Sequence, residues 1–399
     1  MITPHLMRAF ARVDLEAERG EGAWLFDAQG RRYLDFLGGV AVNALGHCHP
    51  ALVEALTRQA RTLWHASNLV RVPGQERLAD RLCAASFADQ AFFTNSGSEA
   101  VDFALKLVRR RAKATVAPQR WRTITFEGGF HGRSMAAIAA GGQIKLTQGF
   151  TPVVTGFDCV PFADLEAVRR AIGPETAAIL IEPVQGDGGI RVAPFDFMRA
   201  VRSLCDEHDL LLVLDEVQTG IGRTGRLFAY EWSGVKPDIV ACAKGLGAGF
   251  PLGAVLTTQA IGGLITPGAH GSTLGGAPLA AAVGNALLDV ILADGFLEGV
   301  RNAADALEEG LRRVVARHPG VFTEVRGIGL MLGLRCAPSN AEVITALRAR
   351  GMLVGPGGDN VVRLLPALTT GAEEIAAALT ALEAACSDLE GITAARTSA

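Results

Sequence analysis

The sequence predicts an α/β fold in which a large domain has a doubly wound, mostly parallel sheet and both chain ends form a smaller α+β domain. Three observations support this prediction. Short apolar runs alternate with amphipathic helical patterns through the middle of the chain, and the runs lack polar alternation. Glycine-rich segments follow these runs, where the chain must turn. At 399 residues the chain is too long for one ordinary core.

The expected strands of the large domain are six short runs that consist almost entirely of apolar residues. Such runs are typical of strands covered on both faces, as in a parallel sheet between two helical layers. Segments 99–112 and 196–209 carry apolar residues at three- and four-residue spacing, which predicts amphipathic helices between strands. The repeated order of strand and helix indicates a doubly wound core. The six runs are residues 91–95, 122–126, 177–183, 210–216, 238–243 and 253–258.

The two ends of the chain differ from the middle. Residues 22–36 have the pattern of a hairpin, and residues 296–318 have that of a long helix. Short strands at 325–335 and 360–366 precede a final alanine-rich helix. The predicted division is an N-terminal segment, residues 1–52, that packs with the small domain; a large domain, residues 53–278; and a small C-terminal domain, residues 279–399.

Composition and charge exclude several classes of protein. A net charge of -3 provides no basic field for nucleic acid or for an anionic membrane surface. No apolar run reaches the roughly 18 residues that span a bilayer, and Arg8, Arg12 and Asp14 interrupt the N-terminus where a signal peptide needs an apolar stretch. Seven scattered cysteines favour a reducing compartment. We therefore expect a cytoplasmic globular protein without nucleic-acid, membrane or metal partners.

The first candidate site segment is the loop Thr94–Glu99, which follows an expected strand and opens an expected helix. Backbone N–H groups at a helix start, together with the helix dipole, form a site for a phosphate group. A second interpretation is structural, because Ser96 and Glu99 have the spacing of a capping box. The loop alone leaves both interpretations open.

Asp215 ends the most hydrophobic run in the chain. A carboxylate at this position is costly to bury unless it meets a cation or a hydrogen-bond donor. One interpretation is that Asp215 caps a loop at the edge of the sheet. The functional interpretation is that it pairs with a protonated ring nitrogen of a ligand.

Lys244 is the only one of five lysines that ends an apolar run and enters a glycine loop. Burial in such an environment lowers the pKa of an amine, which suits Schiff-base formation. The alternative is a structural lysine whose amine reaches solvent. Together the three features provide a phosphate site, an acid for a ring nitrogen and a reactive amine, which are the protein groups that pyridoxal phosphate chemistry needs.

Seven sequence blocks resemble the signatures of the class III (ornithine-type) aminotransferases. They are TNSGSEA, FHGRS, EPVQGDGG, LDEVQTGIGRTG, AKGLGAGFPLG, HGSTLGG and NVVRLLPAL. The resemblance runs in order from GVAVNALGHCHP, at residues 39–50, to NVVRLLP, at residues 360–366. It implies a fold-type I transferase dependent on pyridoxal 5'-phosphate, and it makes His47 and His49 structural residues rather than metal ligands.

The resemblance also assigns residues to the cofactor. Lys244 would bind the cofactor covalently and later act as general acid and base, while Asp215 would keep the ring nitrogen protonated. Gln218 would reach the phenolic oxygen and Phe130 would stack on the ring. Thr273 of the partner subunit would assist the phosphate site, which implies a homodimer with active sites at the interface. The further cofactor residues implied are Ser96, Gly97, Ser98, His131 and Glu182.

Two arginines are the candidate substrate-binding residues. A guanidinium group matches a carboxylate bidentately, as lysine does not, and Arg133 resembles the arginine that takes the carboxylate of the amino donor. Arg363 resembles the arginine that binds the α-carboxylate of 2-oxoglutarate. Without the motifs, a surface ion pair explains either arginine. Asp187 stands where the family usually has glutamate, a partner of the second arginine, and the resemblance also places Ser272 at the substrate.

The amino donor predicted from the resemblance is N-acetylornithine, whose δ-amino group would pass to 2-oxoglutarate in arginine biosynthesis. Family members specific for free ornithine have a bulky tyrosine at the position of Gly39. Here Gly39 and the small Val40 leave space for an acyl group on the α-nitrogen. N-succinylornithine, ornithine and 4-aminobutyrate are the alternative donors.

Two other classes of function fit the sequence less well. A doubly wound nucleotide-binding enzyme is disfavoured because no GxGxxG follows an early strand and no Walker A motif is present. A catalytically inactive binding or regulatory homologue is disfavoured because Lys244, Asp215 and Arg133 are all retained.

Overall fold

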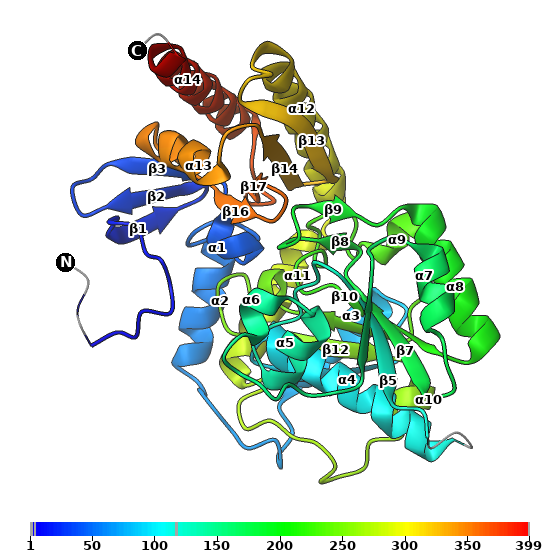
Figure 1. The fold of residues 1–399 in the computed structure, drawn as a ribbon. Helices are drawn as coiled ribbons and strands as arrows, with labels where there is room; N and C mark the ends of the chain where they lie inside the picture. Colours follow the sequence, from blue (N-terminus) through cyan, green and yellow to red (C-terminus); the bar gives the residue numbers. More distant parts are fainter. Residues whose placement is uncertain (1–2, 4, 116–118, 398–399) are drawn as a thin grey trace.

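The central element of the computed structural model is a seven-stranded sheet (Figure 1). The structure describes residue 3, residues 5–115 and residues 119–397. All six predicted strands of the large domain belong to this sheet. Across the sheet the order is β4 (Gln90–Thr94), β12 (Gly253–Thr257), β11 (Ile239–Cys242), β10 (Leu211–Asp215), β7 (Thr176–Ile181), β5 (Arg122–Phe126) and β6 (Phe157–Val160).

Two features of the sheet differ from the sequence prediction. The run 253–258 was expected among the parallel strands, but β12 is antiparallel to both β11 and β4. The connection between β11 and β12 is short, whereas a parallel pair needs a crossover of a dozen or more residues. β6 was not predicted, because this edge strand, Phe157–Val160, is only partly buried and includes Asp158. It therefore lacks the continuous apolar run of the central strands.

Helices cover both faces of the sheet, which explains why its strands are apolar throughout. Leu211 and Val213 of β10 pack in one apolar cluster with α4, while Leu212 and Leu214 pack in another with α8. Both predicted helices are confirmed. The helices of this part are α2 (Pro50–Ala60), α3 (Pro73–Ala84), α4 (Gly97–Ala114), α5 (Met135–Gly141), α6 (Ile144–Thr147), α7 (Leu165–Ala171), α8 (Phe195–His208), α9 (Tyr230–Ser233), α10 (Gln259–Gly262) and α11 (Pro278–Ile291).

The two chain ends meet in smaller sheets at the upper end of Figure 1. The predicted hairpin is present as β2 (Trp24–Asp27) and β3 (Arg32–Asp35), which extend β1 (Ala17–Glu21). β3 also pairs with β15 (Met352–Leu353) from the other end of the chain. The second small sheet contains β13 (Phe322–Ile328), β14 (Met331–Cys336), β17 (Val361–Leu364) and β16 (Gly355–Gly357), next to helices α12 (Phe296–Arg317), α13 (Asn340–Ala349) and α14 (Ala372–Thr397).

A short turn and a buried arginine link these parts of the molecule. The turn α1 (Gly38–Ala41) follows β3, and the hairpin of β8 (Val184–Gln185) and β9 (Arg191–Val192) follows β7.

Arg223 donates hydrogen bonds to the carbonyl oxygens of Leu330 at 3.0 Å and Pro366 at 2.5 Å. Because its guanidinium has only these buried partners in the described residues, burial lowers the pKa of Arg223 to about 10.

No single helix among the described residues is long and apolar enough to cross a bilayer. The bent pair of α11 and α12 reaches the required length and composition only together, with an angle of 72° between the two helices.

Candidate active site

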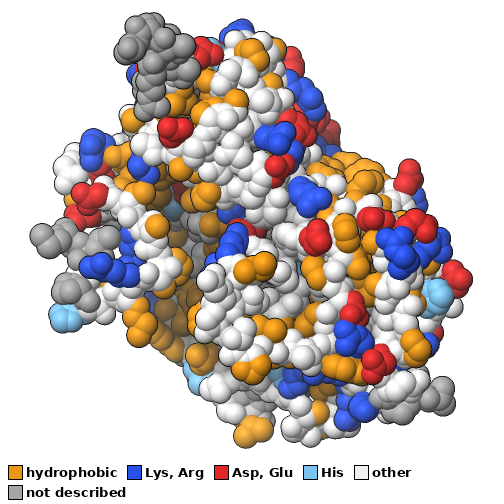
Figure 2. Space-filling view, viewed as in Figure 1, with side chains coloured by type: hydrophobic (Ala, Val, Ile, Leu, Met, Phe, Trp, Pro, Cys, Tyr) orange, Lys and Arg blue, Asp and Glu red, His pale blue; other side chains and the backbone are white. Residues whose placement is uncertain are grey.

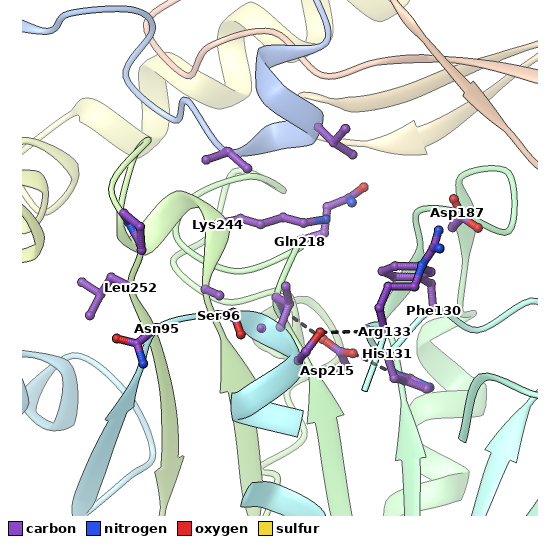
Figure 3. A pocket seen from close by; sticks show the side chains of 18 of the residues that line it. Asn95, Ser96, Phe130, His131, Arg133, Asp187, Asp215, Gln218, Lys244 and Leu252 are labelled. Atoms are coloured by element: carbon purple, nitrogen blue, oxygen red, sulfur yellow. Dashed lines mark hydrogen bonds and ion pairs between the residues drawn. The ribbon is translucent and has the colours of Figure 1, made fainter. Parts of the chain in front are cut away.

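A cavity of about 540 Å³ opens beyond the carboxyl ends of the parallel strands. This is the edge at which open α/β sheets bind ligands, and the volume is in the usual range for small-molecule sites. In Figure 3, Lys244 extends across the cavity above Asp215. Asn95 and Leu252 lie on one side of Lys244, and Phe130 and Asp187 lie on the other.

The structure brings together most of the residues that the sequence singled out. Gly39, Ser272 and Thr273 do not line the cavity of their own chain. The predicted residues that do line it are Val40, Ser96, Gly97, Ser98, Phe130, His131, Arg133, Glu182, Asp187, Asp215, Gln218, Lys244 and Arg363.

Lys244 begins a single 3₁₀ turn, η1 (Lys244–Leu246), directly after β11. Its φ angle is 40°, in the left-handed region that L-residues rarely occupy, which is typical of backbone held for function. Burial lowers the pKa of Lys244 to about 8, and the nearby charge of Arg363 acts in the same direction. About a tenth of the amine is therefore neutral and nucleophilic at pH 7, far more than for an ordinary lysine.

Asp215 lies at the floor of the cavity and is part of a buried network with His131 and Glu182. His131 Nδ1 donates to Asp215 Oδ2 at 2.8 Å, and the backbone N–H of Val217 donates to Asp215 Oδ1 at 3.0 Å. Burial alone would lower the pKa of His131, but the hydrogen bond to Asp215 and the charges of Asp215 and Glu182 raise it overall. The network holds the Asp215 carboxylate in one orientation.

Glu182 follows β7 and accepts a hydrogen bond from the backbone N–H of Phe130 at 2.8 Å. Burial raises the pKa of Glu182, and the charge of Asp215 acts in the same direction, whereas His131 opposes the shift. Glu182 thus fixes the backbone that carries Phe130 and His131 at the cavity wall.

The first turn of α4 forms another wall of the cavity. Ser96 is the N-cap, and its hydroxyl accepts from the backbone N–H of Glu99 at 3.3 Å. The Glu99 carboxylate accepts from the backbone N–H of Asn95 at 2.8 Å. The capping interpretation is therefore correct, and it does not exclude the phosphate interpretation, because the first N–H groups of a helix have no intrahelical acceptors. Gly97 and Ser98 supply these groups.

Gln218 and Phe130 line the middle of the cavity. The Gln218 side chain packs so closely on Gly186 that a β-carbon there would collide with Oε1. This oxygen is buried and has no hydrogen-bond partner among the described residues. The guanidinium carbon of Arg133 lies 5.4 Å from the centroid of the Phe130 ring. Ser98 accepts from the backbone N–H of Arg133 at 3.1 Å, which fixes the segment that bears this arginine.

Asp187 lies between two cations. Its Oδ1 is 3.9 Å from Arg363 Nη2, and its Oδ2 accepts from Lys145 Nζ at 3.3 Å. The Arg363 side chain is 8% exposed and that of Lys145 is 65% exposed, so Asp187 joins a buried charge to a solvated one. Burial lowers the pKa of Arg363, although Asp187 and Glu182 oppose this effect.

The turn α1 is left-handed. Gly38, Gly39, Val40 and Ala41 have φ angles of 56°, 64°, 65° and 62°. A left-handed conformation costs an L-residue roughly 1–2 kcal/mol, and it is rarest for a β-branched residue such as Val40. Val40 and Val42 line the cavity, whereas Gly39 is exposed beside it.

The loop before α11 lies outside this cavity. Ser272 receives a hydrogen bond from Asn95 Nδ2 to its hydroxyl at 3.3 Å and one from Asn68 Nδ2 to its carbonyl at 2.8 Å. Thr273 and Leu274 follow and are exposed. Thr273 therefore makes no contact with the cofactor site of its own chain.

Several residues at the cavity were not identified from the sequence. Val42, Val217 and Leu252 line it, and each looks like an ordinary core residue in the sequence. Lys145 does not line the cavity, but its amine contacts Asp187, which does. Its contact with Asp187 depends on tertiary structure, which residue spacing does not reveal.

The groups in the cavity fit pyridoxal phosphate. Lys244 offers an amine, the first turn of α4 offers N–H groups for a phosphate, and Asp215 offers a carboxylate for a ring nitrogen. The buried and unpartnered Gln218 Oε1 is a further polar atom that a bound molecule can satisfy.

Named relatives are similar to this chain over nearly its whole length. The acetylornithine aminotransferase of Agrobacterium fabrum (strain C58) is 57% identical over 384 residues, which covers 96% of each protein. The acetylornithine aminotransferase of Myxococcus xanthus is 46% identical over 363 residues, which covers 91% of this chain and 90% of the relative.

Solved structures share the fold. The ornithine aminotransferase of Toxoplasma gondii ME49 has a TM-score of 0.93 at 30% identity, covering 97% of this chain and 93% of that one. The N-acetylornithine aminotransferase of Stenotrophomonas maltophilia K279a has a TM-score of 0.84 at 37% identity, covering 96% and 98%. The family model aminotransferase class-III matches residues 8–386. The chain therefore belongs to the class III aminotransferases, and its cofactor is pyridoxal 5'-phosphate.

Proposed function

We propose that this protein is an acetylornithine aminotransferase, which moves the δ-amino group of N-acetylornithine to 2-oxoglutarate. The products are N-acetylglutamate semialdehyde and glutamate, in a step of arginine biosynthesis. The observation that carries the proposal is the Lys244 amine, with its pKa lowered to about 8, in one cavity with Asp215, Arg133 and Arg363. Relatives up to 57% identical that are named acetylornithine aminotransferase support the choice of donor.

Pyridoxal phosphate, when bound, supplies an aldehyde that takes up the amino group and a ring that delocalises negative charge from the reacting carbon. The residues of the chain do the remaining work. Lys244 Nζ moves a proton at the δ-carbon of the donor. With the cofactor bound, Asp215, oriented by His131, would hold the proton at the ring nitrogen, Gln218 would hydrogen-bond the phenolic oxygen and Phe130 would cover one face of the ring.

The two arginines give the site its selectivity for acids. Arg133 binds the α-carboxylate of the donor, and Arg363 binds the α-carboxylate of 2-oxoglutarate. Asp187 neutralises part of the charge on Arg363 when no acid is bound, as their 3.9 Å separation supports. Lys145 competes for the same carboxylate and keeps it from pairing fully with Arg363. Arg363 therefore stays available to the acceptor.

A substrate panel tests the choice of donor. With 2-oxoglutarate as acceptor, we expect kcat/KM for N-acetylornithine to exceed that for ornithine by at least about tenfold, or about 1.4 kcal/mol. The charged α-ammonium group of ornithine would enter a partly apolar space next to Val40, where losing its water is unfavourable. N-succinylornithine is expected to react as well. Equal efficiency with ornithine, or a preference for 4-aminobutyrate, would contradict the proposal and leave the cofactor chemistry intact.

The assembly that we propose is a homodimer in which Thr273 of the partner subunit completes the phosphate site. Exposed apolar side chains near the Ser272 loop support an interface there, because large exposed apolar patches mark contacts between proteins. Figure 2 shows further hydrophobic side chains along a hollow in the region of α2. The exposed residues are Trp64, 66% exposed, Leu69, 94%, Val70, 56%, and Leu274, 53%.

Mixing two defective variants tests this assembly. Lys244→Ala chains are expected to be inactive, and Thr273→Ala chains to bind cofactor about tenfold more weakly. After mixing and exchange of subunits, one site of each mixed dimer combines an intact Lys244 with an intact Thr273. Activity at limiting cofactor is then expected to reach about one quarter of the native value. A fully active monomer in sedimentation, or activity equal to the mean of the two variants, would refute the arrangement.

A further inference from the structure

The left-handed turn at Gly38–Ala41 is held at its start by one buried carboxylate. Asp35 ends β3, and its side chain is 5% exposed. Asp35 Oδ1 accepts from the backbone N–H of Leu37 at 3.0 Å and from that of Gly38 at 2.9 Å. The other oxygen, Oδ2, lies 2.8 Å from His47 Nε2. Asp35 therefore connects the beginning of the turn to an imidazole twelve residues later.

The same imidazole holds the end of the turn. His47 Nδ1 lies 3.4 Å from Asn43 Nδ2, while Asn43 N donates to the Gly38 carbonyl at 2.9 Å. An amide NH₂ donates and a carboxylate accepts, so in these contacts Nε2 donates to Asp35 and Nδ1 accepts from Asn43. One ring thus links both ends of the turn.

His47 is itself fixed against the N-terminal sheet. Its backbone N–H and carbonyl form a two-way bridge with Gly22, at 2.7 Å and 3.0 Å. A β-carbon on Gly20 would lie 2.6 Å from His47 Cγ, so the ring packs directly on the backbone of β1. The backbone bridge and this contact position the ring beside Asp35 and Asn43.

The turn is also part of the reaction cavity. In Figure 3 it is the blue ribbon above Lys244 and Gln218. Val40 and Val42 line the cavity, and a β-carbon on Gly249, in the loop after Lys244, would lie 3.2 Å from Asn43 Oδ1. A change in the turn therefore moves the wall next to the amino donor without touching Asp215 or the first turn of α4.

We infer that Asp35 and His47 are positioning residues that hold the left-handed turn so that Val40 forms the wall against the acyl end of the donor. This inference rests on the proposed function. It assigns the discrimination between N-acetylornithine and ornithine to a strained backbone held from outside the cavity, rather than only to the side chains within it.

Two substitutions at one position test the inference. His47→Leu removes the donor to Asp35, whereas His47→Gln retains an NH₂ group that reaches it. For His47→Leu we expect KM for N-acetylornithine to rise at least about tenfold, while KM for 2-oxoglutarate and the cofactor absorbance stay near native values. His47→Gln is expected to stay within about threefold of native on both substrates. The control is His208→Gln, the same exchange at the end of α8, where the side chain does not line the cavity.

A rescue experiment separates positioning from general stability. Ala41 is left-handed but does not line the cavity, and glycine adopts this conformation without strain. In the His47→Leu background, Ala41→Gly is expected to lower KM for N-acetylornithine again by at least about threefold. If His47→Leu does not fold, the weaker variant Asp35→Asn takes its place, with the same expected selectivity change.

The outcomes distinguish this inference from the proposed function. If native protein prefers N-acetylornithine but His47→Leu changes both KM values equally or changes neither, the inference is wrong and the proposed function stands. If native protein does not use N-acetylornithine, the proposed function itself fails.

Discussion

Replacing Lys244 by alanine is expected to abolish turnover, with a loss of at least about 10⁴-fold in kcat. The side chain supplies the only lysine amine in the cavity within the described part of the chain, and burial lowers its pKa to about 8, which provides the neutral amine for both covalent attachment and proton transfer. Cofactor is expected to remain bound through the other cavity groups but without a covalent bond to protein. Borohydride reduction followed by peptide mass mapping is the direct measurement.

The control for this experiment uses a lysine outside the cavity. Lys113→Ala, on the exposed face of α4, is expected to keep native activity and native labelling. In native protein the reduced adduct is expected on the peptide that contains Lys244. An adduct on Lys106, Lys113, Lys145 or Lys236 would contradict the assignment, as would measurable turnover in the Lys244→Ala protein.

Asp215→Asn is expected to reduce kcat by about 10³-fold, equivalent to about 4 kcal/mol in the activation free energy, with little change in KM for either substrate. The carboxylate bears the negative charge that holds a proton at the ring nitrogen of the cofactor, and an amide of the same shape does not. The neutral side chain can still accept a hydrogen bond from the backbone N–H of Val217, so the fold is expected to persist. Stopped-flow absorbance of each half-reaction gives the rate.

Asp305→Asn, on the exposed side of α12, is the matched control for this charge removal and is expected to have no effect. Thermal unfolding of Asp215→Asn shows whether the buried network with His131 survives. Near-native activity in a folded Asp215→Asn protein would mean that another acid performs this role.

The sequence predicted the large sheet well because its strands are buried on both faces and are therefore almost uniformly apolar. The same rule missed β6, since an edge strand carries Asp158 and is only partly buried. It also wrongly placed β12 among the parallel strands, because apolar composition is the same in parallel and antiparallel central strands. Orientation follows instead from the length of the connection to β11.

The candidate site was predictable to the extent that its residues lie directly after strands. Asp215 ends β10, and Glu182 and Lys244 follow the neighbouring strands β7 and β11, so all three lie at the edge of the sheet where the carboxyl ends meet. Val42 reaches the cavity only through tertiary packing, and the contact of Lys145 with Asp187, which lines the cavity, also depends on tertiary packing. The left-handed turn was also missed, because the glycines at 38 and 39 allow such a backbone but do not extend it through Val40 and Ala41.

The pairing of β3 with β15 determines when, during synthesis, the active site is completed. The seven strands of the large sheet have all been made once residue 257 has left the ribosome, so that sheet has its full set of partners early. Leu34 and Asp35 of β3 are made early, but their partners Met352 and Leu353 are made much later, so this small sheet is completed late. Arg363 is made after these partners. A nascent chain halted before residue 352 thus contains Lys244 and Asp215 but has neither the strand that pairs with β3 nor Arg363. Cofactor chemistry is encoded early in the chain, and substrate selection is completed only by its last fifty residues or so.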